Sequence, residues 1–464
     1  MGSFHSGLIS FSLMTPTTQQ LNDWDKQYVW HAFTQMACYE PLIIESAEGC
    51  ELIDTAGRRL IDGVSSMWCN VHGHRHPTID AAVTEQLGKV AHVTNLGCSN
   101  STTIQLAKRL AELTPGDLDH TFFCSDGASA LEVAIKLAFQ YWHQCEKPQP
   151  QKTSYIGFED AYHGDTIGTI SVGGIDRFNA VFKPLMFPVE RLPIPDRRLP
   201  TRAASCQHHL NTLEETLAQH HESIAAVVIE PLVLGAAGMI VQPEGYLRGV
   251  RDLTRKYNVL MIADEVAVGM GRTGTMFGCQ QEDVVPDILC LGKGLTGGYL
   301  PMSAAIATTQ IWNAYLGDYS DAKQLCHGHT FGGNPLSAAA AIATLDVFEQ
   351  EDTLAQLPAK IERIKQQLSH LAEHPHVGDV RQYGMIAAVE LVKNRETGEH
   401  FPWSERHGHQ VCQFALQHGL WIRPLGDVIV IMPPLAVSIE QIDTMCRVIS
   451  QAIDHVTLSK ASLP

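Results

Sequence analysis

Lys293 is the residue of this chain that is best placed to do chemistry. It lies in the segment DILCLGKGLTGGYLP, between the apolar run ILCL and a cluster of glycines. A lysine at the end of a buried strand either extends its ammonium group to water or is held in place for chemistry, because a deprotonated amine is both a nucleophile and a base. Extension to water is the commoner outcome, so the rest of the chain must decide between the two.

Asp264 is a second candidate, in the segment ADEVAVGMGRTG. It follows VLMIA, which predicts a buried strand, and a carboxylate at the end of such a strand needs a partner. Ligands of open α/β sheets bind at this edge. Gly269, Gly271 and Gly274 have the spacing of a dinucleotide fingerprint, but the following residues do not predict the helix that this fingerprint requires. We therefore predict a glycine-rich loop.

A turn from a strand into a helix is the third candidate. In FFCSDGASALEVAIKLA, small residues that include Gly127 and Ala128 stand where an apolar run gives way to helical periodicity. Small side chains let backbone N–H groups approach a ligand, and a helix N-terminus carries partial positive charge. A phosphate would fit there, although a capped turn without a ligand gives the same pattern.

These three features occur in an order that suits one cofactor, pyridoxal 5'-phosphate (PLP). Lys293 would form a Schiff base with it, Asp264 would keep its pyridine nitrogen protonated, and the turn at Gly127 and Ala128 would hold its phosphate. A non-catalytic binding protein has no use for such a lysine and carboxylate, and a nicotinamide dehydrogenase would need the missing helix. The sequence therefore predicts an enzyme.

Two further side chains could belong to the same site. Tyr162, in DAYHGDTIG, could stack on a flat cofactor or pack within its loop. Arg423, in LWIRPLGDVIVIMPP, lies on or beside an apolar strand. Its guanidinium should meet a carboxylate, from Asp427, from another side chain or from a substrate.

Metal chemistry is not predicted. Histidines occur in HGHRHP and CHGHTF. Neither group lies in a helical pattern with a supporting carboxylate, so we interpret them as loop residues and predict no metal site.

Length and composition agree with small-molecule chemistry. The chain has 464 residues, 45% of them hydrophobic, and a formal net charge of -17, which disfavours nucleic acid or an anionic membrane as a partner. No apolar run is long enough to span a bilayer. The 12 cysteines contain no C-x-x-C pair and indicate a reducing compartment, so we expect a cytoplasmic protein.

The order of patterns predicts an α/β protein. From about residue 79 to residue 343, helical periodicity alternates with runs such as IAAVVIEPLV and VLMIADEV, which predict parallel strands covered on both faces. Nearer the C-terminus, two strand-like segments and a closing helix capped by Ser438 predict a second, smaller domain. We expect the first residues to form a flexible tail.

Four segments resemble the class III aminotransferases of fold-type I: IEPLVLGAAGM, LMIADEVAVGMGRTG, PDILCLGKGLTGGYLP and HGHTFGGNPLSAAAA. The resemblance covers nearly all of the chain after the tail. It implies a large PLP-binding domain (76–344) with a mostly parallel sheet flanked by helices. It also implies a smaller α+β domain from both chain ends (21–75 and 345–464), with a tail at 1–20.

The resemblance also implies roles for individual residues. By resemblance, Gly127 and Ala128 bind the cofactor phosphate, and Tyr162 packs on the pyridine ring. Asp264 pairs with the ring nitrogen, and Lys293 forms the Schiff base. A second set would serve the substrate or a neighbouring subunit, which implies a homodimer with shared active sites. In that set Gly328 would touch the substrate, Thr330 would reach the neighbour's phosphate, and Arg423 would hold a substrate carboxylate.

The likeness is strongest to a branch of the family that aminates 8-amino-7-oxononanoate in biotin biosynthesis. Three positions of the expected substrate pocket depart from the members that use S-adenosylmethionine: Met67 stands before Trp68 in place of a second tryptophan, Phe33 in place of tyrosine, and His329 in place of proline. We expect S-adenosylmethionine as the amino donor. L-lysine as the donor, or another class III ω-aminotransferase activity, is the alternative.

Overall fold

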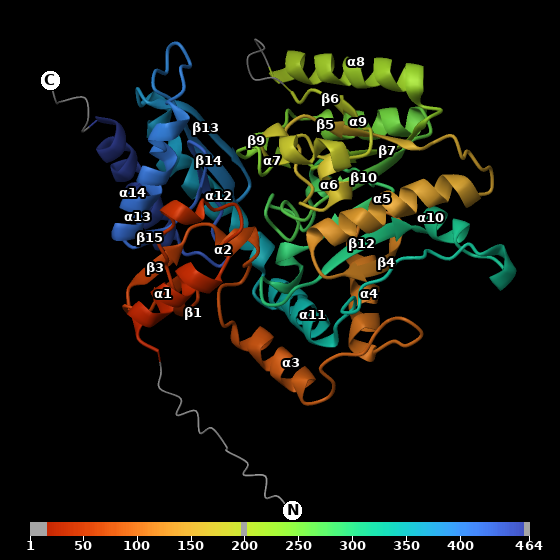
Figure 1. Cartoon of the computed structure of the whole chain (residues 1–464), viewed down its shortest axis with the longest axis horizontal. Helices are drawn as coiled ribbons and strands as arrows, with labels where there is room; N and C mark the ends of the chain where they lie inside the picture. The colour runs from red at the N-terminus through yellow and green to blue at the C-terminus, as the bar shows by residue number, and fades with distance from the viewer. Residues whose placement is uncertain (1–15, 196–201, 459–464) are drawn as a thin grey trace, which may run out of the picture.

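The computed structural model describes residues 16–195 and 202–458, and its centre is a seven-stranded sheet (Figure 1). Strands β10, β11, β7 and β5 run parallel to one another, and β12 pairs antiparallel with β11 and β4. The predicted mostly parallel sheet is therefore confirmed. In spatial order its strands are β4 (Leu118–Cys124), β12 (Ser303–Thr308), β11 (Ile288–Leu291), β10 (Leu260–Asp264), β7 (Ile224–Ile229), β5 (Ser154–Phe158) and β6 (Glu190–Leu192).

Helices cover both faces of this sheet, which is why its strands are apolar throughout. Every residue of β7 is buried. Val227 and Ile229 join the core on one face, whereas Ala226 and Val228 join the core on the other, as the two-residue period of a strand requires. Helix α9 (Tyr246–Lys256) packs into the first core and α5 (Gly127–Gln144) into the second.

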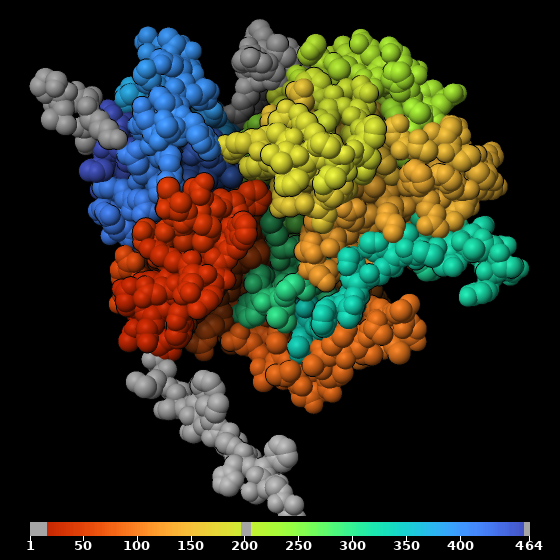
Figure 2. Space-filling view, in the orientation of Figure 1, coloured from red at the N-terminus to blue at the C-terminus, as the bar shows by residue number. Residues whose placement is uncertain are grey.

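The two ends of the described chain meet beside the large sheet. Strand β3 (Arg59–Asp62) pairs in parallel with β15 (Leu420–Trp421), so one small sheet contains strands from both ends. Figures 1 and 2 show these N-terminal and C-terminal segments, in red and blue, on the same side of the molecule. The first small sheet also contains β1 (Ile44–Glu48) and β2 (Glu51–Asp54), and the second contains β13 (Val377–Tyr383), β14 (Ile386–Leu391), β17 (Val428–Ile431) and β16 (Pro424–Leu425).

Two predicted boundaries differ from the elements. Residues 1–15 of the expected tail lie outside the described residues, but residues 18–20 form the first turn of α1 (Thr18–Tyr28). The Thr17 hydroxyl accepts from the backbone N–H of Gln20, whose side chain accepts from the backbone N–H of Thr17. This capping box starts the helix within the stretch that was expected to be tail. The expected domain boundary at residue 345 falls inside α11 (Pro335–Gln350), which continues across it.

The remaining helices complete the layers. They are α2 (Ser65–Trp68), α3 (Pro77–Leu87), α4 (Ser101–Leu113), α6 (Ile167–Val172), α7 (Asp176–Asn179), α8 (Arg202–His220), α10 (Thr309–Ala314), α12 (Thr353–Leu368), α13 (His407–Gln417) and α14 (Ile439–Leu458), and a short hairpin joins β8 (Val233–Leu234) to β9 (Ile240–Val241). Ser438 caps α14 as predicted, because its hydroxyl accepts from the Gln441 N–H. Within residues 16–195 and 202–458, no helix is both long and apolar enough to cross a bilayer.

A buried ion pair fixes helix α9 to the strands that carry the candidate lysine and aspartate. Both carboxylate oxygens of Asp287, next to β11, accept from the guanidinium of Arg251 in α9, at 2.6 and 3.0 Å. Asp287 also accepts from the backbone N–H of Met261 in β10, at 2.7 Å. Removing the carboxylate would leave a buried guanidinium uncompensated.

We therefore expect Asp287→Ala to lower the free energy of unfolding by about 3–5 kcal/mol, as for other broken buried ion pairs. Asp283→Ala is the matched control, because Asp283 pairs with Arg248 at the surface and such pairs contribute at most about 1 kcal/mol. Urea unfolding followed by circular dichroism measures both. Equal losses in the two variants would contradict this role of Asp287.

Candidate active site

A cavity of about 460 Å³ lies where β5, β7, β10 and β11 end. Because these strands are parallel, their carboxyl ends meet at one edge of the sheet. This geometry brings together Lys293, Asp264 and the turn that opens α5, although they are far apart in sequence. The lining residues are Trp68, Asp126, Gly127, Ala128, Tyr162, His163, Gly164, Asp165, Thr166, Glu230, Ala236, Asp264, Val266, Ala267 and Lys293.

The start of α5 forms one wall of the cavity. Asp126 is the N-cap, and its carboxylate accepts from the Ser129 N–H at 2.9 Å. The N–H groups of a first helical turn have no partner within their helix and point outward from its end, where they favour an anion. A side chain could not replace Gly127, because an added Cβ atom would lie 2.6 Å from Val266. The close approach that the glycine permits keeps this wall compact.

Asp264 is buried against a histidine. It is the last residue of β10, and its Oδ2 atom lies 2.8 Å from Nδ1 of His163. Its Oδ1 atom accepts from the Val266 N–H. Burial lowers the pKa of His163, but the hydrogen bond to Asp264 and the negative charges of Asp264 and Glu230 outweigh it, so the pKa lies above its ordinary value. Asp264 and Glu230 thus favour the protonated form of His163.

Glu230 is a member of the site that the sequence analysis missed. It directly follows β7 and is buried, and it accepts from the N–H groups of Tyr162 and Gly235, both at 2.9 Å. Burial raises its pKa from 4.5 to about 7, against the opposing charge of His163. The available signal was its position in IEPLV, a carboxylate after an apolar strand, which is the pattern that singled out Asp264.

Lys293 faces the same cavity from the segment after β11. Burial lowers its pKa below the ordinary 10.5, although the charges of Asp264 and Glu230 act in the opposite direction. Its Nζ atom lies 5.0 Å from the centre of the Trp68 ring. The amine is therefore easier to deprotonate than that of a lysine in water. A lysine needs this property to act as a nucleophile or a base, because only the neutral amine can do so.

Tyr162 and Trp68 are the predicted aromatic residues that reach the cavity. The Tyr162 hydroxyl donates to Asp165 at 2.7 Å, and its ring meets Phe178 edge-on. Phe178 in turn lies 5.2 Å from the ring of Phe33, measured between centroids. Phe33 itself is 62% exposed and does not line the cavity.

Four further predicted residues lie outside the cavity lining. Met67 is 44% exposed, and its sulfur accepts a long contact of 3.7 Å from the guanidinium of Arg423. Among the described residues no ion pair joins Arg423 to a carboxylate, and Asp427 accepts from Gly408 instead. Gly328 and Thr330 are exposed in the segment before α11. The structure thus gathers the predicted cofactor residues of one chain but not these four.

The buried Glu230 should make stability depend on pH. Between pH 4.5 and about 7 the folded protein keeps a proton that the unfolded chain has released. The contribution of this group to stability therefore falls as the pH rises through that window. Glutamine does not titrate, so the stability of Glu230→Gln should lack this dependence. Between pH 5 and pH 8 we expect its free energy of unfolding to rise by about 1–3 kcal/mol relative to that of wild type.

Urea unfolding of both proteins at intervals of one pH unit measures this difference. Glu222→Gln, at an exposed glutamate just before β7, is the control and should follow the wild-type profile. A constant difference between Glu230→Gln and wild type would show that Glu230 does not titrate with a raised pKa.

Comparisons with known proteins point to one family. The family model described as aminotransferase class-III matches residues 34–453. The adenosylmethionine-8-amino-7-oxononanoate aminotransferase of Geobacter sulfurreducens is 50% identical over 95% of this chain and 98% of its own length.

Solved structures give the same picture. The enzyme of that name from Methanocaldococcus jannaschii is 42% identical and has a TM-score of 0.89, over 94% of this chain and 99% of that one. A PLP-bound amine transaminase from an uncultivated Pseudomonas species is 31% identical with a TM-score of 0.87, over 92% of this chain and 99% of that one. With a family model that spans most of its length and relatives at this level of identity, the chain belongs to the class III aminotransferases.

Proposed function

We propose that this aminotransferase uses PLP to convert 8-amino-7-oxononanoate to 7,8-diaminononanoate in biotin biosynthesis, with S-adenosylmethionine as the amino donor. The observation that carries the proposal is the single cavity shared by Lys293, Asp264 and the N-terminus of α5. The choice of substrates is supported by the names of relatives at 46–50% identity, which specify this acceptor and this donor.

The residues in the cavity fit PLP. Its volume of about 460 Å³ lies within the usual range for cofactor pockets. The first turn of α5, with Gly127 and Ala128, would hold the phosphate, Asp264 would pair with the pyridine nitrogen, and the Tyr162 ring would lie against the cofactor. Lys293 would attach it covalently.

When bound, PLP supplies an electron sink that stabilises negative charge on the carbon bearing the amine. Lys293 Nζ, once free, takes the proton from that carbon and holds it for return. Burial lowers its pKa below that of a lysine in water, which favours the neutral amine that can accept this proton. Asp264, which lies 2.8 Å from Nδ1 of His163, would pair with the protonated pyridine nitrogen.

Arg423 supports an acceptor with a carboxylate. Burial lowers its pKa, and among the described residues its guanidinium makes a weak contact with the Met67 sulfur. A guanidinium in this environment gains most from an anionic partner, and a nonanoate chain provides one. We propose that Arg423 binds the carboxylate of the acceptor. We also propose that Trp68 and Met67, with Phe33 beyond them, form the wall of the substrate pocket.

The proposal includes a homodimer in the cytoplasm. In this chain Gly328 and Thr330 are exposed and do not line the cavity of their own subunit. We propose that Gly328 contacts the substrate and that Thr330 completes the phosphate site of a neighbouring subunit. Sedimentation equilibrium should then give twice the chain mass of 51.0 kDa.

Lys293→Ala should abolish turnover and leave the fold intact, because one amine serves as covalent attachment and as base. We expect a fall in kcat of at least about 10⁴-fold, as for other groups with two catalytic roles. Lys365→Ala, at an exposed lysine of α12, is the control and should match wild type. Coupled assays of 7,8-diaminononanoate formation measure all three proteins. Wild-type turnover by Lys293→Ala would refute the assignment.

The choice of donor is tested by mixing the PLP-loaded enzyme with each candidate separately. We expect S-adenosylmethionine to abolish the visible absorbance band of the bound cofactor, because transfer of the amine changes the chromophore. L-lysine should leave the band in place. Conversion by lysine alone would replace the donor and keep the acceptor. Turnover with a simple amine and pyruvate, but not with the oxononanoate, would favour a general ω-aminotransferase instead.

A further inference from the structure

The turn that carries Met67 and Trp68 is strained. Ser65, Ser66 and Trp68 have positive φ angles of 53°, 60° and 63°, which non-glycine residues rarely adopt. Ser66, with ψ of -85°, lies near the geometry of the rare, strained kind of γ-turn. Such strain persists only where the surrounding structure holds it, and it concentrates at functional sites.

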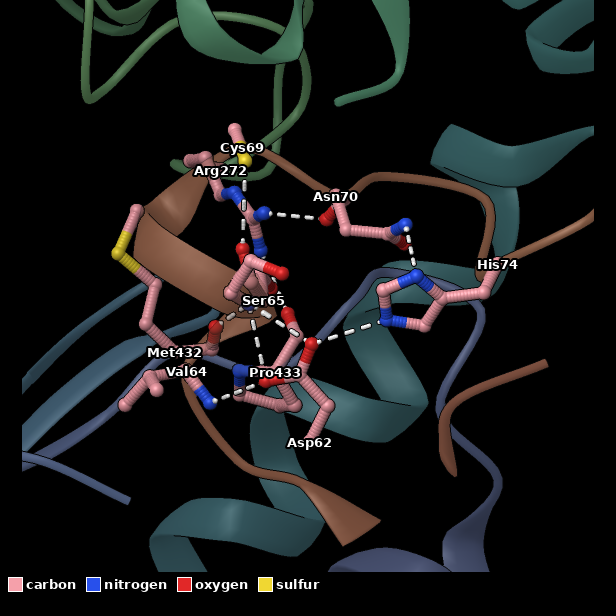
Figure 3. Close-up of polar contacts among 10 residues, drawn as sticks. Asp62, Val64, Ser65, Cys69, Asn70, His74, Arg272, Met432 and Pro433 are labelled. Carbon is pink, nitrogen blue, oxygen red and sulfur yellow. Dashed lines mark hydrogen bonds and ion pairs between the residues drawn. The ribbon is translucent and has the colours of Figure 1, made fainter. Parts of the chain in front are cut away.

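Asp62, the last residue of β3, holds the turn from below (Figure 3). Its carboxylate has no exposed surface. The Ser66 N–H donates to both of its oxygens, at 3.0 and 2.7 Å, and the Val64 N–H donates to Oδ1 at 3.3 Å. His74 Nε2 lies 3.2 Å from Oδ2. The carboxylate thus collects the backbone donors that this conformation turns inward.

Further contacts tie the same turn to the rest of the site. The Ser65 hydroxyl donates to the carbonyl of Met432 at 2.7 Å. Arg272, buried in the glycine-rich loop after Asp264, donates to the carbonyls of Asn70 and Pro433 at 2.6 and 2.5 Å. Figure 3 shows these groups converging around Ser65. The turn is therefore fixed to the loop beyond β10 as well as to the C-terminal segment.

Two groups of the proposed site depend on where this turn lies. Trp68 covers the Nζ atom of Lys293 at 5.0 Å, and the Met67 sulfur contacts the Arg423 guanidinium at 3.7 Å. A shift of the turn would move the Trp68 ring away from the Lys293 amine. It would also move the Met67 sulfur, which contacts Arg423. Asp62 itself does not line the cavity.

We propose that Asp62 is a positioning residue for acceptor binding: it holds the Ser65–Trp68 turn in its strained conformation and so sets the distance between Lys293 and Arg423 that the acceptor must span. This inference rests on the proposed function for the identity of the acceptor. It does not involve the phosphate or pyridine contacts, which come from α5 and β10.

Asp62→Asn is the direct test, because the amide has the size of the carboxylate but sets an NH₂ group against the Ser66 N–H. We expect KM for 8-amino-7-oxononanoate to rise about tenfold, the effect of losing a charge-assisted hydrogen bond. The PLP dissociation constant should stay within about twofold, since its proposed contacts are elsewhere. Alkylation of Cys69, next to the turn, mapped by mass spectrometry, should be faster.

Rescue by Ser66→Gly separates positioning from a general loss of stability. Glycine adopts the conformation of residue 66 without strain, so it should restore KM and the Cys69 alkylation rate in the Asp62→Asn background. Asp54→Asn is the matched control. Asp54 is a buried aspartate at the end of β2 that accepts from the N–H groups of Ala56 and Arg58, remote from the turn. It should change neither quantity.

Three results would overturn the inference: an unchanged KM in Asp62→Asn, an equal rise in Asp54→Asn, or no rescue by Ser66→Gly. Failure of the proposed function is distinguishable, because the wild-type protein would then not aminate the oxononanoate at all. The alkylation of Cys69 would still report whether Asp62 holds the turn.

Discussion

The burial of ionisable groups at one edge of a parallel sheet is the constraint on which this structure depends. Asp264, Glu230 and Lys293 stand at or just after the ends of apolar strands and line one cavity, where His163 contacts Asp264. Charges so placed are costly unless they compensate one another. The resulting pKa shifts lower the proton affinity of the lysine and raise that of Glu230. A fold that needed only stability would place apolar side chains there.

The rest of the architecture serves to hold this edge in place. Helix α9 is fixed to β10 and β11 through Arg251 and Asp287, and α5 is placed so that its first turn closes the cavity. The two chain ends join through β3 and β15 and place a strained turn above Lys293. The rigid sheet thus supplies the proposed cofactor side, and the segments from the chain ends supply the proposed substrate side.

The proposed cofactor side was well predicted from the sequence, because each of its residues lies next to the apolar run that positions it. Lys293 and Asp264 stand beside apolar runs, and in parallel strands such positions must share an edge, so their proximity followed from pattern alone. The turn at Gly127 was visible for the same reason. Glu230 carried the same signal after β7 and was overlooked, while the role of His163 depends on a contact across 101 residues that no pattern encodes.

The substrate side was less predictable because it is assembled from distant segments. Arg423 was expected to need a carboxylate, yet the described residues give it only the Met67 sulfur. The positive φ angles of Ser65, Ser66 and Trp68 could not be predicted from residue type, because serine and tryptophan both disfavour them. Phe33 was assigned to the pocket by resemblance, but in this chain it reaches the site only through Phe178.

The central claim is that Lys293 carries the cofactor, and borohydride reduction followed by peptide mass mapping tests it most directly. Reduction makes the bond between a lysine and PLP permanent, so the modified residue can be located by mass. The account predicts the added mass on the peptide that contains Lys293 and on no other lysine peptide. Modification of a different lysine, or none in protein loaded with PLP, would contradict it.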